Sequence, residues 1–485
     1  MGFAFRVQCT LLLLVTGCGA TPFPDAGIDA GADAGSVDAG DSDAGDSDAG
    51  GFDAGSADAG TVGLPVRHLA DAGAAARGEA LFTGGKLGGR LVPRLAMRNL
   101  WVVWQVAPPA TDAAYWEAFR ARYGLAVAPF SNEGYPLGVH GVDAMWATID
   151  CLACHAANVA GEVVIGAGNS EFDLQGLFDD LAALAVVAPM YGFPAYTLPF
   201  TLTNRTGAAG SNDAMGLGMT LAKRAAPGAA INTEYGFQRP PAWWSLKHKG
   251  VHYTDGSGEA GATRLMMATL LASSMTLAEL QAQDAAFADV YQYLLTLNPP
   301  RWPFAVDPVL VAKGRAVFST ACASCHGVYQ GAGSFPDRVV PRAEVGTDPI
   351  RAERFGAAEA ALINASWFGA DHPMRATGGY LAPVLTGVWA NAPYFHNGSV
   401  PTLEAVLDSS KRLVRWRRVG HEKTDYDADA VGWKVTPGPA VGQATIEARR
   451  TFDSMAAGLS NAGHLYGDPL TAEDRRAVLE YLKTM

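Results

Sequence analysis

Cysteine is scarce in this chain, since only six of its 485 residues are cysteine. A small secreted scaffold stapled by disulfides carries a far higher density, so that class of protein is excluded. Long apolar runs are also missing. Beyond the N-terminal segment, no run reaches the roughly 20 residues that a membrane-spanning helix needs. The length suits a globular protein of two or three domains.

Positive charge is in short supply as well. Lys and Arg number 36 against 48 Asp and Glu, for a net charge of −12, so no nucleic-acid partner is expected. Residues 1–60 alone hold ten Asp and one Arg, whereas the other 425 residues carry 35 basic and 38 acidic groups. The net charge therefore describes an acidic tail, and the rest of the chain is nearly neutral.

The first 17 residues have the pattern of a secretory signal peptide. Arg6 is followed by the apolar run Leu11–Val15, which is too short to span a bilayer. The segment Val15-Thr16-Gly17-Cys18 resembles a bacterial lipobox, which implies cleavage before Cys18 and acylation of that residue. The alternative is an ordinary signal peptide with a coincidental cysteine. We expect an exported lipoprotein, anchored through Cys18 to a membrane on the periplasmic side or at the cell surface.

Residues 18–64 are expected to form a disordered tether. Within this stretch the sequence Asp-Ala-Gly occurs eight times with small variations. Asp and Gly disfavour regular structure and Ala buries little surface. The conformational entropy lost on ordering such a segment therefore outweighs the free energy gained by burial. A strict Gly-X-Y period with proline is missing, which excludes collagen.

The four cysteines beyond the signal region all lie in two copies of one motif, C-x-x-C-H. The copies are Cys151-Leu152-Ala153-Cys154-His155 and Cys322-Ala323-Ser324-Cys325-His326. Two thiols on one helical turn can form thioethers to a haem, and the adjacent His can ligate its iron. A zinc site would need no His after both second cysteines, and a redox pair would favour a βαβ context. We predict two covalently attached haem c groups, with His155 and His326 as iron ligands.

A helix pattern precedes each motif. Ala312–Phe318 lies just before the second copy, as in cytochrome c domains, and the similar Arg77–Phe82 lies about seventy residues before the first. The residues between are rich in Trp and Tyr, which could cover a haem or form ordinary core. We expect a mainly α-helical fold with two cytochrome c-like domains, 65–305 and 306–485. The prolines of Pro299–Pro303 mark the boundary.

Residues 65–485 resemble the bacterial di-haem cytochrome c peroxidase superfamily, which includes the methylamine-utilisation enzymes and the rubber oxygenases. The resemblance is carried by the haem motifs and by Gly387–Leu403, which contains Pro393-Tyr394-Phe395-His396-Asn397-Gly398. Gln238–Trp244 and Arg264–Met267 are similar to the rubber-oxygenase branch, although the chain is shorter than a full rubber oxygenase. The resemblance implies an oxidoreductase in which the second haem relays electrons and the first activates peroxide or dioxygen.

Three residues are candidates for the sixth ligand of the second haem: His396, Met455 and His464. In the resembled family this ligand precedes the last helix, which here should begin after Thr471 with the capping pattern Thr471–Asp474. His464 lies just before that helix and is the predicted ligand. Met455 is the second choice, and His396 is expected to support the pocket by hydrogen bonds.

The first haem is expected to keep an open coordination position. Trp243 and Trp244 are candidate catalytic residues that line its distal pocket or carry electrons between the haems, and a structural role is the alternative. His248 and His252 are distal candidates or part of a surface turn. Three carboxylates in the same region could act as the acid–base group: Glu171, Glu234 and Glu259.

The leading hypothesis is a lipid-anchored di-haem oxidoreductase. Its expected partners are a small redox protein or other electron donor and a peroxide, dioxygen or organic substrate, polyisoprene included. The resemblance leaves open a calcium ion between the domains. The basic cluster Lys411–Arg418 could bind haem propionates or an acidic partner, or form a solvated face. The rival functions are a non-catalytic electron-transfer cytochrome and a lipoprotein whose haems only stabilise the fold.

Overall fold

The computed structural model describes residues 63–84, 87–192, 196, 208–212, 236–267, 275–440 and 445–485. These residues belong to one compact unit that begins at Ser56. The predicted signal peptide, the lipidation site Cys18 and nearly all of the tether lie outside the described residues, as does the candidate carboxylate Glu234. The boundary expected between two domains stays a prediction.

The first organising feature is a crossing of two helices, α1 (Ala72–Thr83) and α9 (Asp284–Thr296). Helix α1 begins after Asp71, whose side chain accepts a hydrogen bond of 2.6 Å from the amide of Ala74. The helices touch at Gly78, where a Cβ atom would overlap the backbone carbonyl of Asp289. Phe82, one turn further on, is buried beside this crossing.

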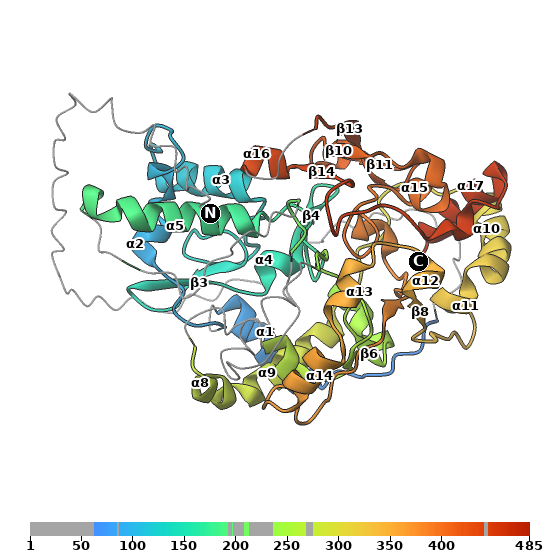
Figure 1. Ribbon diagram of the computed structural model, residues 1–485, viewed down its shortest axis with the longest axis horizontal. Coiled ribbons are helices and arrows are strands. Elements are labelled where there is room, and N and C mark those ends of the chain that lie inside the picture. Colours follow the sequence, from blue (N-terminus) through green and yellow to red (C-terminus); the bar gives the residue numbers. More distant parts are fainter. Residues whose placement is uncertain are drawn as a thin grey trace, which may run out of the picture. The chain divides into compact units, whose positions relative to one another are not determined.

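A second crossing repeats the same arrangement with α10 (Pro308–Ala321) and α17 (Ala472–Leu482). Gly314 of α10 lies against the backbone carbonyl of Ala477, and Phe318 is buried one turn later. Figure 1 shows α10 and α17 packed together near the C-terminal end. The helices expected over Arg77–Phe82 and Ala312–Phe318 are confirmed.

The capping residue expected for the last helix is also confirmed. The hydroxyl of Thr471 accepts from the amide of Asp474 at 3.1 Å and donates to its carboxylate at 2.8 Å. The apolar stripe predicted for this helix, Val478, Leu479 and Leu482, is buried. The C-terminal helix is therefore fixed both by its cap and by its packing against α10.

The expectation of a mainly helical fold needs correction, because helix takes 40% and strand 13% of the structure. The strands were missed because each has only two to four residues, too few for a detectable alternation. They are β1 (Val92–Pro93), β2 (Val139–Gly141), β3 (Trp146–Ile149), β4 (Ala156–Val159), β5 (Glu162–Ile165), β6 (Val251–His252), β7 (Gly258–Glu259), β8 (Val339–Pro341), β9 (Gly379–Leu381), β10 (Arg415–Arg418), β11 (Tyr426–Asp427), β12 (Gly432–Trp433), β13 (Val435–Pro437) and β14 (Thr451–Asp453).

In the part of the chain that the structure describes, all the strand pairs are antiparallel. Two sheets have three strands, in the orders β1-β3-β2 and β13-β10-β14, and the other strands form two-stranded ribbons. The remaining α-helices are α2 (Arg94–Met97), α3 (Asp112–Tyr123), α4 (Leu152–His155), α5 (Leu174–Val187), α7 (Thr263–Met267), α8 (Leu277–Ala282), α11 (Ala323–His326), α12 (Arg342–Val345), α13 (Ile350–Arg354), α14 (Ala357–Asn364), α15 (Leu403–Leu407) and α16 (Ile446–Arg449). Short 3₁₀ turns include η1 (Leu100–Val102), η2 (Ala188–Tyr191), η3 (Trp243–His248), η5 (Val388–Asn391), η6 (Ser409–Lys411), η7 (Lys423–Asp425) and η8 (Leu465–Gly467).

The aromatic residues inserted before the first haem motif form a core of their own. Helix α3 buries Trp116, Phe119 and Tyr123 on one face, and Trp104 stacks on Tyr115 with ring centres 5.5 Å apart. These rings pack against α5 and do not line either of the cavities described below. Ordinary core packing is therefore the role that the structure gives them.

One buried ion pair joins distant parts of the chain. Asp173, which caps α5, accepts hydrogen bonds of 3.0 and 3.1 Å from Nε of Arg449 at the end of α16. Both side chains are almost fully buried.

By length and apolarity alone, Leu174–Tyr191 could cross a membrane, so the expected absence of such a run needs correction. One face of this segment nevertheless packs in the core through Leu177, Leu181 and Leu184.

Candidate haem sites

The first C-x-x-C-H motif lies at the edge of a cavity of about 300 Å³, which we call the first cavity. Its residues Cys151, Cys154 and His155 all line this space. Asp150 fixes the turn, because its carboxylate accepts from the amide of Leu152 at 2.7 Å and lies 3.0 Å from Nδ1 of His140. Within the described residues, neither thiol of the motif forms a disulfide. The motif is thus folded and open toward a cavity.

His155 is oriented by two contacts. Its Nδ1 atom lies 3.0 Å from the carbonyl oxygen of Pro241, and its ring stacks on Trp243 with centres 4.2 Å apart and planes 14° apart. Burial lowers the pKa of His155 to about 4, so the imidazole is neutral, as metal binding requires. With Nδ1 engaged, Nε2 is the nitrogen that remains for a metal.

The second motif opens onto another cavity of about 400 Å³, which we call the second cavity. Cys322, Cys325 and His326 line it, and Nδ1 of His326 lies 3.0 Å from the carbonyl oxygen of Pro383. Both proximal histidines are therefore held in the same way, by the carbonyl of a proline that is distant in sequence.

His464 lies opposite His326. The two ring centres are 6.3 Å apart, and both residues line the second cavity. Two imidazoles on opposite sides of one iron, each with a metal–nitrogen bond of about 2 Å, would have their centres roughly 6 Å apart. Among the described residues, the buried Nδ1 atom of His464 has no hydrogen-bond partner. The residues present therefore fit a haem with two histidine ligands.

The loop before His464 is held from two sides. Nδ2 of Asn397, which is fully buried, donates to the carbonyl of Ser460 at 2.9 Å. The guanidinium of Arg412 donates at 2.8 Å to each of the carbonyls of Asn461 and Gly463. Neither residue was predicted to support the ligand. The position of Asn397 in the motif segment Gly387–Leu403 is a sequence feature that could have indicated this role. Arg412 could not be singled out, because it is one of several basic residues in Lys411–Arg418.

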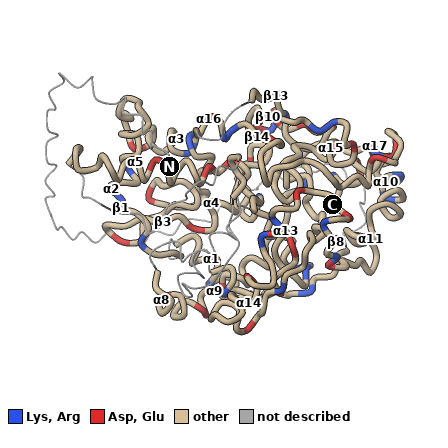
Figure 2. The backbone as a smooth tube through the Cα atoms, viewed as in Figure 1, with Lys and Arg blue, Asp and Glu red and all other residues tan. Residues whose placement is uncertain are grey.

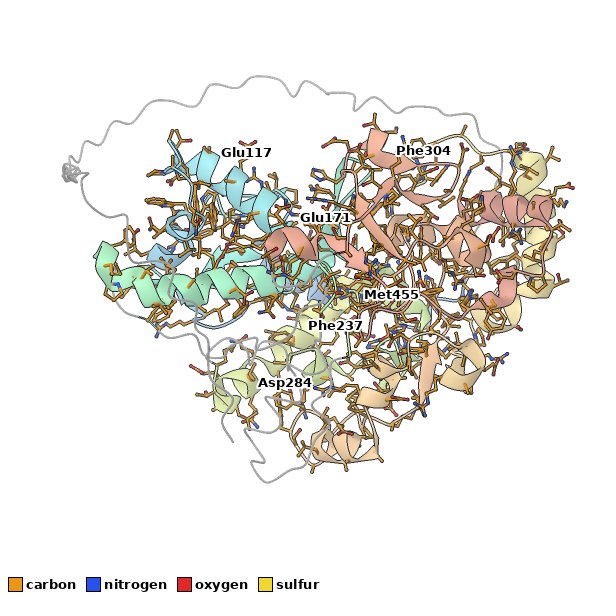
Figure 3. All side chains as sticks on the ribbon, turned by 45° about the horizontal axis from the view of Figure 1, so that its top comes forward. Glu117, Glu171, Phe237, Asp284, Phe304 and Met455 are labelled. Carbon is orange, nitrogen blue, oxygen red and sulfur yellow. The ribbon has the colours of Figure 1, made fainter. Side chains whose placement is uncertain are left out.

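The other two candidates for the sixth ligand lie elsewhere. Met455 is 72% exposed, does not line the second cavity and is labelled in Figure 3. His396 lines the second cavity and stacks on Tyr380 with ring centres 4.1 Å apart. Its buried Nε2 atom has no hydrogen-bond partner among the described residues, and burial lowers its pKa to about 3.

The two tryptophans are placed differently from each other. Trp243 lines the first cavity from the side of His155, on which it stacks, and this is not the distal side. Trp244 is completely buried, donates from Nε1 to the carbonyl of Thr386 at 2.8 Å and lines neither cavity. Neither tryptophan therefore lies in a distal pocket of the first haem site.

His248 and His252 are buried, so the alternative of a surface turn is wrong. His248 bonds to the carbonyl of Pro65 at 3.0 Å, whereas His252 lines the first cavity and lies 3.4 Å from the hydroxyl of Tyr291. Across the described residues, no second imidazole pairs with His155 as His464 pairs with His326. The two cavities therefore differ in their potential ligands.

The described carboxylate candidates do not line the first cavity. Glu171 forms an ion pair of 3.2 Å with Arg418, and Glu259 is exposed near His372.

Four members of the basic cluster have acidic partners: Lys411 with Glu404, Arg415 with Asp453, Arg417 with Glu447 and Arg418 with Glu171. Figure 2 shows Lys and Arg interspersed with Asp and Glu along the described chain. The cluster therefore presents little unpaired charge to an acidic partner.

Residues 379–417 match a family described as RoxA-like, cytochrome c-like. Two similar curated proteins come from Sinorhizobium fredii (strain NBRC 101917 / NGR234). The uncharacterised protein y4iJ is 26% identical, over 39% of this chain and 41% of its own length. The uncharacterised protein y4iM is 27% identical, over 50% of this chain and 63% of its own length. The matches therefore span about half the length of these relatives.

A crystal structure of a MauG-like protein associated with microbial copper homeostasis is also similar, with 19% identity and a TM-score of 0.27. The match covers 53% of this chain and 76% of that chain. The family match contains both Asn397 and Arg412, the residues that hold the loop of His464. Together with the two haem motifs, the family match supports a cytochrome c-like region with covalently bound haem c.

Proposed function

We propose that this chain is an exported di-haem oxidoreductase with one reactive haem and one electron-relay haem. The observation that carries the proposal is the difference between the cavities. His326 faces His464 at 6.3 Å, whereas His155 has a stacked tryptophan and no equivalent imidazole among the described residues. When bound, the iron of the first cavity would supply peroxide or dioxygen chemistry, and that of the second would supply electron storage and transfer.

The residues of the chain prepare this chemistry. Pro241 holds His155 in one orientation through Nδ1, and Trp243 fixes the plane of its ring. Side chains such as Phe172, Phe178 and Leu294 give the first cavity an apolar lining that limits the access of water. His326 and His464 would together hold the iron of the second haem, and that site would then have no position for an external ligand.

The surroundings of the protein belong to the same proposal. A lipid on Cys18 and the acidic tether would hold the protein at a membrane on the periplasmic side or at the cell surface. A small redox protein or another electron donor would supply electrons. The substrate would be a peroxide, dioxygen or an oxidisable organic molecule, and a calcium ion between the two halves is part of the hypothesis.

Ligand binding by the purified full-length protein tests the proposal. Two haems per chain are expected from the pyridine haemochrome and from the intact mass. Electron paramagnetic resonance should show one high-spin and one low-spin haem. Cyanide added to the oxidised form, and carbon monoxide added to the reduced form, should change the spectrum of the first haem only. Assays with peroxide and a reduced cytochrome, against dioxygen and polyisoprene, would then identify the substrate class.

One observation favours the rival function, a pure electron-transfer cytochrome. His252 and Met266 both line the first cavity and offer groups that can ligate iron. If one of them ligates the first haem, neither haem would bind cyanide or carbon monoxide in any redox state. That result would reject the enzyme and establish the rival.

A further inference from the structure

The two cavities share a wall. Five residues line both of them: Pro241, Ala242, Lys249, Tyr253 and Thr254. Pro241 and Ala242 precede the turn η3, Lys249 follows it directly, and Tyr253 and Thr254 follow strand β6. A polar group on this wall can therefore act on the contents of either cavity.

Lys249 is the one charged residue of the shared wall. Only 7% of its surface is exposed, and burial lowers its pKa to about 8. Within the described ranges its ammonium group has no hydrogen bond and no carboxylate within 4 Å. The charge of Asp337 acts on it, but this carboxylate already pairs with Arg67 and accepts from the amide of Gly250. A buried cation without an anion is costly, which indicates a missing partner.

Arg239 repeats this situation in the second cavity. It is 8% exposed, and one terminal nitrogen donates to the carbonyls of Asn391 and Pro393. Its Nε atom is buried without a hydrogen-bond partner in the part of the chain that the structure describes. Its positive charge also acts on His155, so Arg239 lies close enough to influence both sites. Two buried cations with unsatisfied donors thus flank the partition between the cavities.

We propose that Lys249 and Arg239 form a carboxylate-binding pair whose ligands are the propionate groups of the two haems, with Lys249 acting on both. This inference rests on the proposed occupancy of both cavities by haem. Propionates are the anions that the prosthetic group itself brings, and charge-assisted hydrogen bonds are the strong way to bind them. A positive charge beside a haem disfavours the ferric state, so the pair raises both reduction potentials.

Spectroelectrochemical titration of the full-length holoprotein tests this role. Lys249→Met should lower the equilibrium constant for reduction of both haems by about tenfold, which is about 59 mV for one electron. Lys249→Arg keeps the charge and should keep both potentials. Lys247→Met is the matched control, because Lys247 lies on the same turn, lines neither cavity and bonds to Asn298. It should leave both potentials unchanged.

The outcomes separate the two proposals. Absence of haem in the wild type would reject the proposed function. If two haems are bound and their reduction potentials are the same in Lys249→Met as in the wild type, this inference alone is rejected. A shift of only one haem would also reject it. If Lys249→Met fails to fold, Lys249→Gln and the propionate bending bands in resonance Raman spectra of the wild type take its place. Bands of unbonded propionates, or wild-type potentials that respond to added acetate, would assign the pair to an external carboxylate and overturn the inference.

Discussion

His464 has a backbone conformation that histidine seldom adopts. Its φ is 49°, in the left-handed region, where a side chain with a Cβ costs roughly 1–3 kcal/mol. Its amide donates to the carbonyl of Val345 at 2.6 Å, and the carbonyls before it are bound by Arg412. The surrounding contacts therefore impose the position of this imidazole opposite His326.

Replacing His464 should expose its role directly. His464→Ala removes an imidazole that pairs with His326, so one low-spin haem should become high-spin in optical and paramagnetic resonance spectra. Added imidazole should restore the low-spin signal. Met455→Ala is the control and should change nothing, because Met455 is exposed. Unchanged spectra in His464→Ala would assign the ligand to another residue.

Arg412 is expected to position His464 without touching the iron. Arg412→Met leaves several buried carbonyls without donors, at a cost of about 2 kcal/mol, and should loosen the loop. We expect a mixture of high-spin and low-spin forms of the second haem that sharpens to low-spin on cooling. Arg417→Met, whose residue pairs with Glu447 near the surface, should keep the wild-type spectrum. Equal spectra for both variants would contradict the positioning role.

Local chemistry decided which single residues could be predicted. The C-x-x-C-H motifs are readable because their residue types and spacing determine the chemistry, whereas the choice of His464 came from the resemblance to a family that has a ligand before its last helix and stays a prediction. Trp243 could not be assigned to the side of His155, because that depends on how η3 folds over the motif. Lys249 gave little signal, because the sequence does not show that its side chain is buried on a wall between two cavities.

The helix crossings depend on two glycines, which gives a prediction about packing. Gly78→Ala and Gly314→Ala place a methyl group against the backbone carbonyls of Asp289 and Ala477. Each should lower the free energy of unfolding by about 1–3 kcal/mol, measured by thermal or urea unfolding. Gly73→Ala is the matched control in α1, where a Cβ would meet only ordinary contacts. It should be neutral or slightly stabilising. Equal free energies of unfolding for the three variants would contradict the prediction, because they would show that the crossing helices can move apart without cost.

Some helices and strands can be predicted from a sequence pattern, whereas others depend on tertiary packing. Helices α10 and α17 were predictable because apolar periodicity and caps coincide in them. The strand pair β4-β5 is too short to show a clear alternation, although Val163, Val164 and Ile165 of β5 are β-branched residues that favour strands. Short strands of this kind are hard to predict because four residues do not separate a strand from other extended chain.

Buried neutral histidines give the whole molecule a dependence on pH. Burial lowers the pKa of His252 and His396 to about 3, with the positive charges of Lys249 and Arg351 adding to the effect. In the unfolded chain both bind protons below about pH 6.5, whereas the folded protein does not. Their contribution to stability is therefore complete above that pH and is lost as the pH falls toward 3.

This loss should be measurable by urea unfolding of the oxidised protein between about pH 7.5 and pH 5. Each of these histidines should lower the free energy of unfolding by about 1.4 kcal/mol per pH unit below about 6.5. His252→Gln should reduce the slope by one proton. A wild-type slope that His252→Gln does not alter would contradict the explanation.

The two glycine crossings have a consequence for how this chain can vary. Each pairs a helix before a haem motif with a helix far beyond it, so the intervening chain is a loop closed at its base. Closure entropy grows only with the logarithm of loop length, by about 0.6 kcal/mol for each doubling. Loop closure therefore adds little to the cost of changing the length of the chain between α1 and Cys151. A protein engineer could accordingly lengthen this segment at an exposed turn, provided that the aromatic core packed against α5 is kept.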